Sequence, residues 1–279
     1  FLGEKEVDGF AQLIDEYWDQ LEAVDQEKTK KQRKAAAPQE LVRKAKKLLD
    51  GGKAVDVALF GRMLADLPAV NQDAATQVAH ALSTHRVERG FDYYTAVDDD
   101  RRGPEDEAGA DMIGQIEFNS ATLYRYAVLD VNKLIDNLHG DRELALSAVE
   151  AFTTAFVRAV PTGKQTSFAA HNAPDFVGIS QRHIAPMNLA NAFEKPVVSD
   201  NRHSLTEQSV QNLKQINNKL SSVYGDTNDQ WLYLDLTGRW ADHTDNQSTD
   251  FKGPGEAQSD LISLAQRTRE LASKTMSEF

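Results

Sequence analysis

The sequence predicts an α+β protein, and three observations support that fold class. Apolar residues recur at three- and four-residue spacing near both ends of the chain, which is typical of amphipathic helices. Short β-branched and aromatic runs between them are typical of strands. The predicted strands and helices interleave, with long polar insertions. At 279 residues, 41% of them apolar, the chain can fill the core of one large domain or two small ones.

The first quarter of the chain is predicted to be mainly helical. Apolar side chains on one face predict a helix over residues 4–26. A polar break at 28–38 separates it from a second helix over 39–49, which ends at two glycines. Residues 54–60 alternate imperfectly but contain two β-branched valines, so we expect a strand there.

The middle of the chain is predicted to be rich in strands. Residues 91–97 and 116–129 contain the aromatic and β-branched residues that strands favour. Residues 101–109 combine Gly, Pro and charge, which indicates a loop. Residues 76–87 fit either a helix or one side of a strand, and local propensity slightly favours the helix.

The second half of the chain alternates between the two kinds of element. We expect helices over residues 131–138, 142–160, 204–224 and 256–276. Strands are expected over residues 165–170 and 175–180. Asp141 stands where an N-cap is needed, and Ser204 with Glu207 forms a capping-box pattern.

The composition excludes several classes of protein. The chain has no cysteine, so it has no disulfide framework, thiolate metal site or cysteine nucleophile. No apolar run approaches the ~18–20 residues that a membrane span needs. The net charge of -12 argues against a protein that binds nucleic acid over a broad surface, because proteins that bind phosphates in this way usually have a basic surface. The acidity is concentrated in residues 54–130, which carry 14 acidic and 6 basic side chains.

The chain begins at Phe1, and we expect that its natural N-terminus lies upstream. The opening residues lack the basic start, apolar core and small-residue cleavage site of a secretory signal. We also expect a cytoplasmic location and no membrane contact. The basic cluster at residues 28–34 is more typical of a solvated helix end or loop than of a binding patch.

Candidate metal and catalytic motifs are weak. His80 and His85 lie five residues apart, so neither a helix nor a strand directs both rings at one ion. We expect packed or hydrogen-bonded histidines there. The triplet Asp98-Asp99-Asp100 is predicted to be a solvated loop. A Ser/His/Asp triad stays open, although no Gly-x-Ser-x-Gly motif is present. No cofactor or metal is predicted.

The segment Gly163-Lys164-Gln165-Thr166 resembles the tail of a phosphate-binding loop. A Walker loop needs glycine where Arg158 stands and Ser or Thr where Gln165 stands, so nucleotide hydrolysis is excluded. Two interpretations remain. One is a turn with backbone N–H groups and one lysine, suited to a single phosphate, and the other is a plain turn.

Three aromatic residues lie in the segment 91–97, beside a polar loop. Aromatic side chains on a protruding hairpin are unfavourable unless they meet another surface. They could belong to a core, to a protein interface, or to platforms for unstacked bases. From the residues alone, a core or an interface is favoured.

Seven sequence strings, in this order within residues 54–195, are together highly specific. They are VDVALFGRM from Val55, VAHALSTH from Val78, DYYTAVDD from Asp92, Gly114 with EFNS from Glu117, LYRY from Leu123, VPTGKQ from Val160 and MNLANAFEK from Met187. This set resembles the CasC family of the RAMP superfamily. Members of that family are the CRISPR RNA-binding backbone subunits of the type I-E Cascade complex.

The resemblance implies a right-hand-shaped protein whose copies line up along one CRISPR RNA. It implies helical fingers over residues 1–53 and a modified RRM-like (ferredoxin-like) palm over 54–279, with a β-hairpin thumb at about 87–121. It also implies a strand within 76–87. The expected partners are CRISPR RNA, neighbouring copies, other Cascade subunits and, through guide pairing, target DNA. The kinked guide would serve antiviral defence.

The resemblance further implies which residues contact RNA. The matching positions are Arg62 and Met63 at a kinked base, Tyr93, Tyr94, Thr95 and Val97 in the thumb, and Gly163, Lys164, Gln165 and Thr166 in a palm loop along the RNA backbone. Methionine is polarizable and can pack against a base. Base–aromatic stacking tolerates any sequence, as a guide requires. Tyr93 stands where the family commonly has Trp, so weaker stacking is expected.

Two other functions stay open beside the favoured one, a non-catalytic RNA-binding backbone protein. Related type III backbone subunits cleave bound target RNA with a thumb-adjacent Asp, for which Asp98 or Asp99 could be nominated. The type I-E-like strings argue against such an endoribonuclease. The third possibility is a generic oligomer-forming protein unconnected with RNA.

Overall fold

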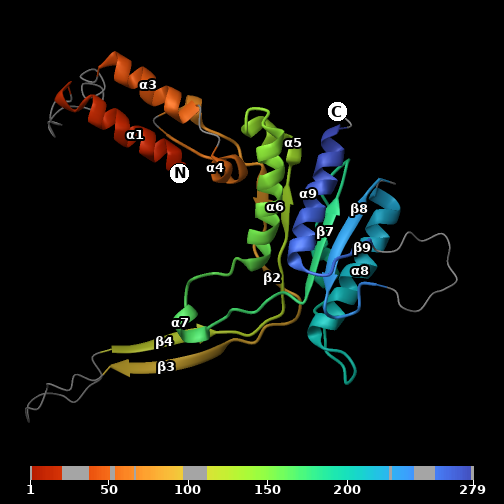
Figure 1. Cartoon of the computed structure of the whole chain (residues 1–279). Coiled ribbons are helices and arrows are strands. Elements are labelled where there is room, and N and C mark those ends of the chain that lie inside the picture. The colour runs from red at the N-terminus through yellow and green to blue at the C-terminus, as the bar shows by residue number, and fades with distance from the viewer. Residues whose placement is uncertain are drawn as a thin grey trace, which may run out of the picture.

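The computed structural model describes residues 2–20, 38–50, 54–65, 67–96, 112–225, 228–241 and 255–277. Helices and short strands are mixed along the chain, so the predicted α+β class is confirmed (Figure 1). Within these residues the strands form three two-stranded sheets and one three-stranded sheet. No helix among them is long and apolar enough to cross a membrane.

Two helices form a pair that projects from the body of the molecule (Figure 1). They are α1 (Glu4–Glu16), which leads into the 3-10 turn η1 (Trp18–Gln20), and α3 (Gln39–Asp50). Lys44 of α3 forms a 2.6 Å ion pair with Glu16 of α1, and its ammonium lies over the ring of Tyr17. The second predicted helix is confirmed. Helix α1 ends at Glu16, earlier than predicted, and residues 21–26 of that prediction lie outside the described part.

Residues 55–60 form a helix, so the predicted strand there is wrong. Helix α4 (Val55–Phe60) buries Val57, Ala58 and Leu59, and the last two join a core with residues of α5 (Val131–Asn137) and α6 (Arg142–Arg158). This packing outweighs the β-propensity of its valines. Gly61 ends the helix with φ +78°, and a Cβ there would lie within 3 Å of the backbone of Gln72 and Ala74.

The local preference for a helix over residues 76–87 is also wrong, and the strand implied by the resemblance is right. Strand β1 (Thr76–Val78) pairs with β6 (Ala127–Leu129), and β2 (Leu82–Ser83) pairs with β5 (Leu123–Tyr124). Each residue and its partner in the other strand are forty or more positions apart in the chain, so local propensity does not reflect these pairings. The single strand predicted over 116–129 is instead divided into three.

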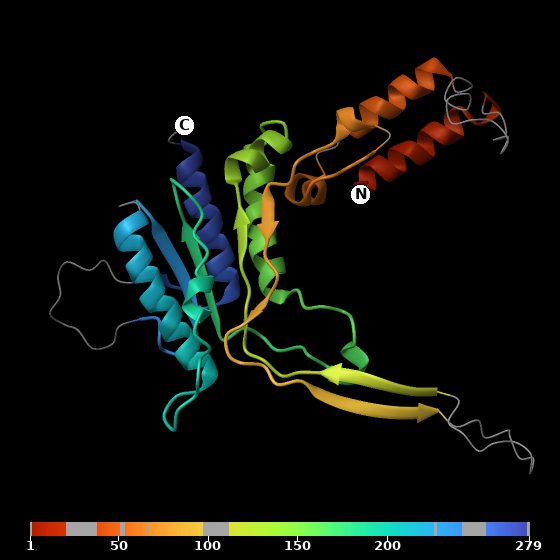
Figure 2. The ribbon, with the colours of Figure 1, turned by 180° about the vertical axis from the view of Figure 1, so that it is seen from behind.

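A long antiparallel hairpin projects on the same side as the α1–α3 pair (Figures 1 and 2). It consists of β3 (Gly90–Ala96) and β4 (Met112–Phe118), with Gly90 opposite Phe118 and Ala96 opposite Met112. The predicted strand over 91–97 is therefore confirmed for its described residues. The predicted acidic loop, including Asp98-Asp99-Asp100, lies outside the described part.

The C-terminal half is layered. Strand β7 (Phe176–Gln181) pairs antiparallel with β8 (Gln230–Asp235), and β9 (Glu256–Ala257) pairs parallel with β8. Side chains on β8 alternate between two cores. Tyr233 packs with α8 (Leu205–Tyr224) and the fully buried Trp240, while Leu232 packs with Leu264 of α9 (Leu261–Ser277).

The predicted elements of this half are largely confirmed. Ser204 and Glu207 exchange capping hydrogen bonds of 3.2 and 2.8 Å at the start of α8, and Asp141 caps α6. The last helix begins at Leu261 and not at residue 256, because Glu256 and Ala257 pair with β8. Strand β8 is an element that the sequence reading did not predict.

Candidate functional site

Tyr93 and Tyr94 point to opposite faces of the β3–β4 hairpin. Neighbouring residues in a strand point to opposite sides, so Tyr93 shares one face with Gln115 and Tyr94 shares the other with Gly114. Tyr93 is 75% exposed, whereas Tyr94 is 42% exposed. The hairpin therefore presents an aromatic ring on each of its two sides.

The Tyr94 face is shaped by two glycines. The ring of Tyr94 lies over Gly114, and the ring of Phe118 lies over Gly90, so that a Cβ on either glycine would come within 3 Å of ring atoms. Ile116 lies between them in the strand and, like both rings, is about two-fifths exposed. This face therefore carries three large apolar or aromatic side chains, together with Asp92 opposite Ile116.

The Tyr93 face is more polar. It also carries Phe91 and, opposite it, Glu117. Glu117 forms an exposed 3.0 Å ion pair with Arg89 at the root of the hairpin. An exposed pair of this kind adds little stability. The Tyr93 ring thus shares its face with the polar side chains of Gln115 and Glu117.

Hydrogen bonds attach the hairpin root to the body. The Nε2 atom of His85 accepts the backbone N–H of Thr122 at 3.1 Å, and Nδ1 donates to the Arg86 carbonyl at 2.7 Å. The buried hydroxyl of Thr84 is hydrogen-bonded to Ser209 of α8 at 2.9 Å. His85 is thus a hydrogen-bonded histidine, as predicted, whereas His80 is exposed and not packed. Among the described residues, no group of three or more His, Asp or Glu side chains could hold a metal ion.

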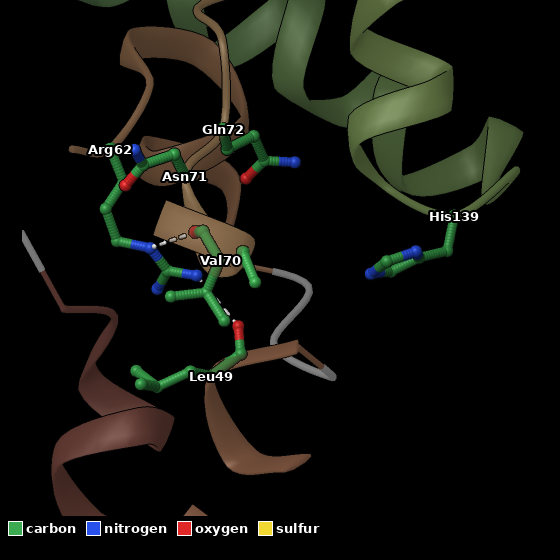
Figure 3. Close-up of a pocket in the computed structure, with 7 residues that line it drawn as sticks. Leu49, Arg62, Val70, Asn71, Gln72 and His139 are labelled. Atoms are coloured by element: carbon green, nitrogen blue, oxygen red, sulfur yellow. Dashed lines mark hydrogen bonds between the residues drawn. The ribbon is translucent and has the colours of Figure 1, made fainter. Parts of the chain in front are cut away.

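Arg62 is buried, and its guanidinium is committed to the protein interior. Its Nη1 donates to both carboxylate oxygens of Glu6 at 2.8 Å, its Nη2 to the Leu49 carbonyl at 2.8 Å and its Nε to the Val70 carbonyl at 3.2 Å. Arg62 and His139 both line a small pocket of about 90 Å³. Figure 3 shows the lining side chains. Arg62 therefore ties α1, α3 and the turn η2 (Pro68–Val70) together.

Glu6 is a residue that the sequence reasoning missed. It is 3% exposed and shares the buried side of α1 with Leu13, at a helical spacing of seven residues. A carboxylate at such a position needs a charged partner, because burying an unpaired charge is very costly. An acidic residue on an otherwise apolar helix face was the signal available in the sequence.

Met63 follows Arg62 and has the opposite environment, since 81% of its surface is exposed. It lies three residues after the end of α4, which packs beside α6. The β3–β4 hairpin instead lies beyond the C-terminal end of α6, apart from α4 (Figure 1). Within one chain, Met63 and Tyr93 therefore do not form a single site.

The predicted strand over residues 165–170 is wrong, because a short helix, α7 (Gln165–Phe168), stands there. Lys164 and Ala169 flank it with φ of +58° and +46°, a left-handed backbone that interrupts any strand. Gly163 has no atom within 4 Å of where its Cβ would stand. The turn before α7 is thus open on its outer side.

The four predicted residues of this segment differ in direction. Gly163, Lys164 and Thr166 are exposed. Gln165 instead turns inward, and its Nε2 donates to the Pro161 carbonyl at 2.7 Å. The structure thus gathers these four residues on one turn, but leaves the Gln165 amide engaged within it. Of the remaining predicted residues, Thr95 lies in β3 opposite Ile113, and Val97 lies outside the described part.

Comparison with known proteins places the chain among CRISPR-associated proteins. Residues 1–253 match the model of a family described as CT1975-like protein. A chain from a CRISPR RNA-guided surveillance complex in a pre-nicking state is similar, with a TM-score of 0.70 and 29% identity over 96% of this chain and 67% of that one. A chain from a further CRISPR RNA-guided surveillance complex has a TM-score of 0.63 and 33% identity over 78% of each. No curated protein matches.

Proposed function

The chain belongs to the CT1975-like family of Cas proteins, and from this premise we propose that it is a backbone subunit of a Cascade-type CRISPR RNA-guided surveillance complex. The two solved chains described above come from CRISPR RNA-guided surveillance complexes. The observation that carries the proposal is the projecting β3–β4 hairpin, which has an aromatic ring on each face. In this proposal the hairpin binds CRISPR RNA without recognising its sequence.

Tyr93 is the principal stacking residue in this proposal. A ring that is 75% exposed on a narrow hairpin has little protein to pack against, and a base offers a flat partner. Stacking on an aromatic side chain contributes about 1–3 kcal/mol per base whichever base it is. Such tolerance is needed, because sequence recognition in these complexes is delegated to guide pairing.

The separation of Met63 from the hairpin supports assembly of several copies along one RNA. The hairpin of one copy reaches the RNA that lies against Met63 of the next, and each junction kinks the guide. In this arrangement residues 1–53 are the fingers, 54–279 an RRM-like palm, and about 87–121 the thumb. Arg62 is a positioning residue, because the hydrogen bonds of its guanidinium fix the backbone next to Met63. Lys164 contacts a phosphate.

We propose a non-catalytic role in a type I-E system, in which the bound guide pairs with target DNA. The competing endoribonuclease role is tested with assembled complex, complementary RNA and Mg²⁺. Regularly spaced cuts that disappear in Asp98→Ala would overturn the non-catalytic proposal. Intact RNA in both complexes supports it.

The main test measures guide retention. Complex is assembled with Met63→Ala/Tyr94→Ala subunits and with two guides of unrelated spacer sequence. We expect weaker retention of both guides to a similar degree, while Ile262→Ala, at an exposed position of α9, retains them like the wild type. Unchanged retention would contradict these roles. Purified protein that never carries RNA would favour an oligomer unconnected with RNA.

A further inference from the structure

Tyr94 and Phe118 are each packed over a glycine of the opposite strand. Tyr94 of β3 lies over Gly114 of β4, and Phe118 of β4 lies over Gly90 of β3. In both cases the glycine stands directly opposite the aromatic residue in the antiparallel register. The two pairs are separated by the Asp92–Ile116 pair on the same face. The hairpin therefore has two notches, each filled by a ring from the other strand.

We propose that Gly114 is a positioning residue that holds the Tyr94 ring flat along the hairpin, with one face free for a base. The inference rests on the proposed RNA-binding function and deepens it. Side chains in a strand normally stand roughly perpendicular to the sheet, which would present the edge of the ring. A glycine opposite gives the ring room to lie down across the neighbouring strand, as aromatic residues do over glycine in other sheets.

The exposure of Tyr94 agrees with this orientation. Its exposed fraction of 42% is just over half that of Tyr93, whose cross-strand neighbour is Gln115. Stacking uses the face of a ring, so a ring that is already seated needs little further ordering when a base arrives. A side chain at residue 114 would push the ring off the backbone and remove both advantages.

Gly90 provides a matched control within the same hairpin. A methyl group there would displace Phe118 in the way that a methyl group on Gly114 would displace Tyr94. Phe118 is at the root of the hairpin, whereas Tyr94 lies nearer the other end of the paired strands. Gly90→Ala thus perturbs the strands comparably but leaves Tyr94 seated on Gly114.

The experiment compares guide affinity in complexes assembled from wild type, Gly114→Ala, Gly90→Ala, Tyr94→Ala and the double variant Gly114→Ala/Tyr94→Ala. We expect Gly114→Ala and Tyr94→Ala each to lose about 5- to 150-fold, the range that one stacked base contributes. The double variant should lose no more than Tyr94→Ala, because the glycine acts through the tyrosine. Gly90→Ala should bind within about threefold of the wild type.

A second measurement does not depend on RNA. In NMR spectra of the glycine-labelled full chain, the Tyr94 ring should shift the α-protons of Gly114 upfield. That shift should vanish in Tyr94→Ala, while the corresponding shift of Gly90 by Phe118 persists. An unshifted Gly114 signal in the wild type would overturn the seating of the ring.

The affinity results separate two kinds of failure. If Tyr94→Ala binds the guide like the wild type, the proposed RNA contact of Tyr94 is wrong. If Tyr94→Ala is weak but Gly114→Ala binds normally, the positioning role is wrong and the RNA contact stands. Equal losses in the two glycine variants would also overturn the positioning role, since they would report only damage to the hairpin.

Discussion

Glu6 and Arg62 lie 56 residues apart in the chain and form a buried ion pair, in which Nη1 of Arg62 is 2.8 Å from both carboxylate oxygens. The two side chains are only 3% and 4% exposed. Glu6 also accepts the backbone N–H of Gly3 at 2.9 Å. The pair joins the first helix to the segment after α4, so it fixes the base of the projecting α1–α3 pair.

Replacing Glu6 by Gln should destabilise the protein strongly. The substitution leaves the Arg62 charge buried without its partner, which typically costs about 3–5 kcal/mol. Urea unfolding followed by circular dichroism measures the loss. The control is Glu16→Gln, which breaks the exposed pair with Lys44 and should cost no more than about 1 kcal/mol. Similar losses in the two variants would show that the buried pair does not anchor α1.

Replacing Tyr93 by Ala should weaken guide binding without affecting the fold. The ring is largely exposed, so its removal deletes little packing, whereas a lost base stack costs about 1–3 kcal/mol. Filter binding of assembled complex gives the affinity, and thermal unfolding of the free chain gives the stability. Tyr93→Trp should bind at least as tightly as the wild type. A drop in unfolding temperature that matches the loss of affinity would assign Tyr93 a structural role instead.

Replacing Lys164 by Ala should reduce the salt dependence of guide binding. A lysine on a phosphate releases about one counterion, so the slope of log affinity against log salt should fall by roughly 0.7–0.9. The effect should be the same for guides of different sequence, because phosphate contacts carry no sequence information. Lys219→Ala, on the exposed side of α8, serves as the control. An unchanged slope for Lys164→Ala would remove the phosphate contact.

Tyr124 should resist ionisation in alkali. Burial raises the pKa of its phenol to about 12, although the N–H of Leu189, which its oxygen accepts at 3.2 Å, acts in the other direction. A raised pKa in the folded state means that the protonated form is favoured there. The associated stability is therefore complete below pH about 10 and is lost as the pH rises toward about 12.

The difference in absorbance at 295 nm between wild type and Tyr124→Phe measures this ionisation. Its midpoint should lie near pH 12. In urea unfolding, Tyr124→Phe should also lose less stability than the wild type between pH 10 and 12. A midpoint near pH 10 would show that the hydroxyl is solvated, despite its hydrogen bond to Asn188.

Elements with strong local signals could be predicted from the sequence. Helices α3, α6 and α8 have regular apolar spacing, and Asp141 and Ser204 cap the last two as expected. The errors fall where a distant partner decides the structure. Helix α4 is held by packing on α5 and α6, and β1 exists because β6 pairs with it. Local propensity contains neither contact.

The same division applies to the candidate site. The aromatic residues of the hairpin are visible in the sequence, and the opposite faces of Tyr93 and Tyr94 follow from their adjacency once a strand is assumed. The placement of Gly114 opposite Tyr94 could not be derived, because the long connection between the strands leaves their register open. The identity of Arg62 as the partner of Glu6 could not be derived either, since the two residues are 56 positions apart.

The opposed tyrosines also give the hairpin a front and a back. A nucleic-acid strand has a 5′ end and a 3′ end, so the two polarities can be matched. Copies aligned in one sense along a strand would each turn the Tyr93 face toward the same end of it. Every subunit would then bind the strand in the same 5′-to-3′ sense. A strand of the reverse polarity would meet each hairpin at its opposite face.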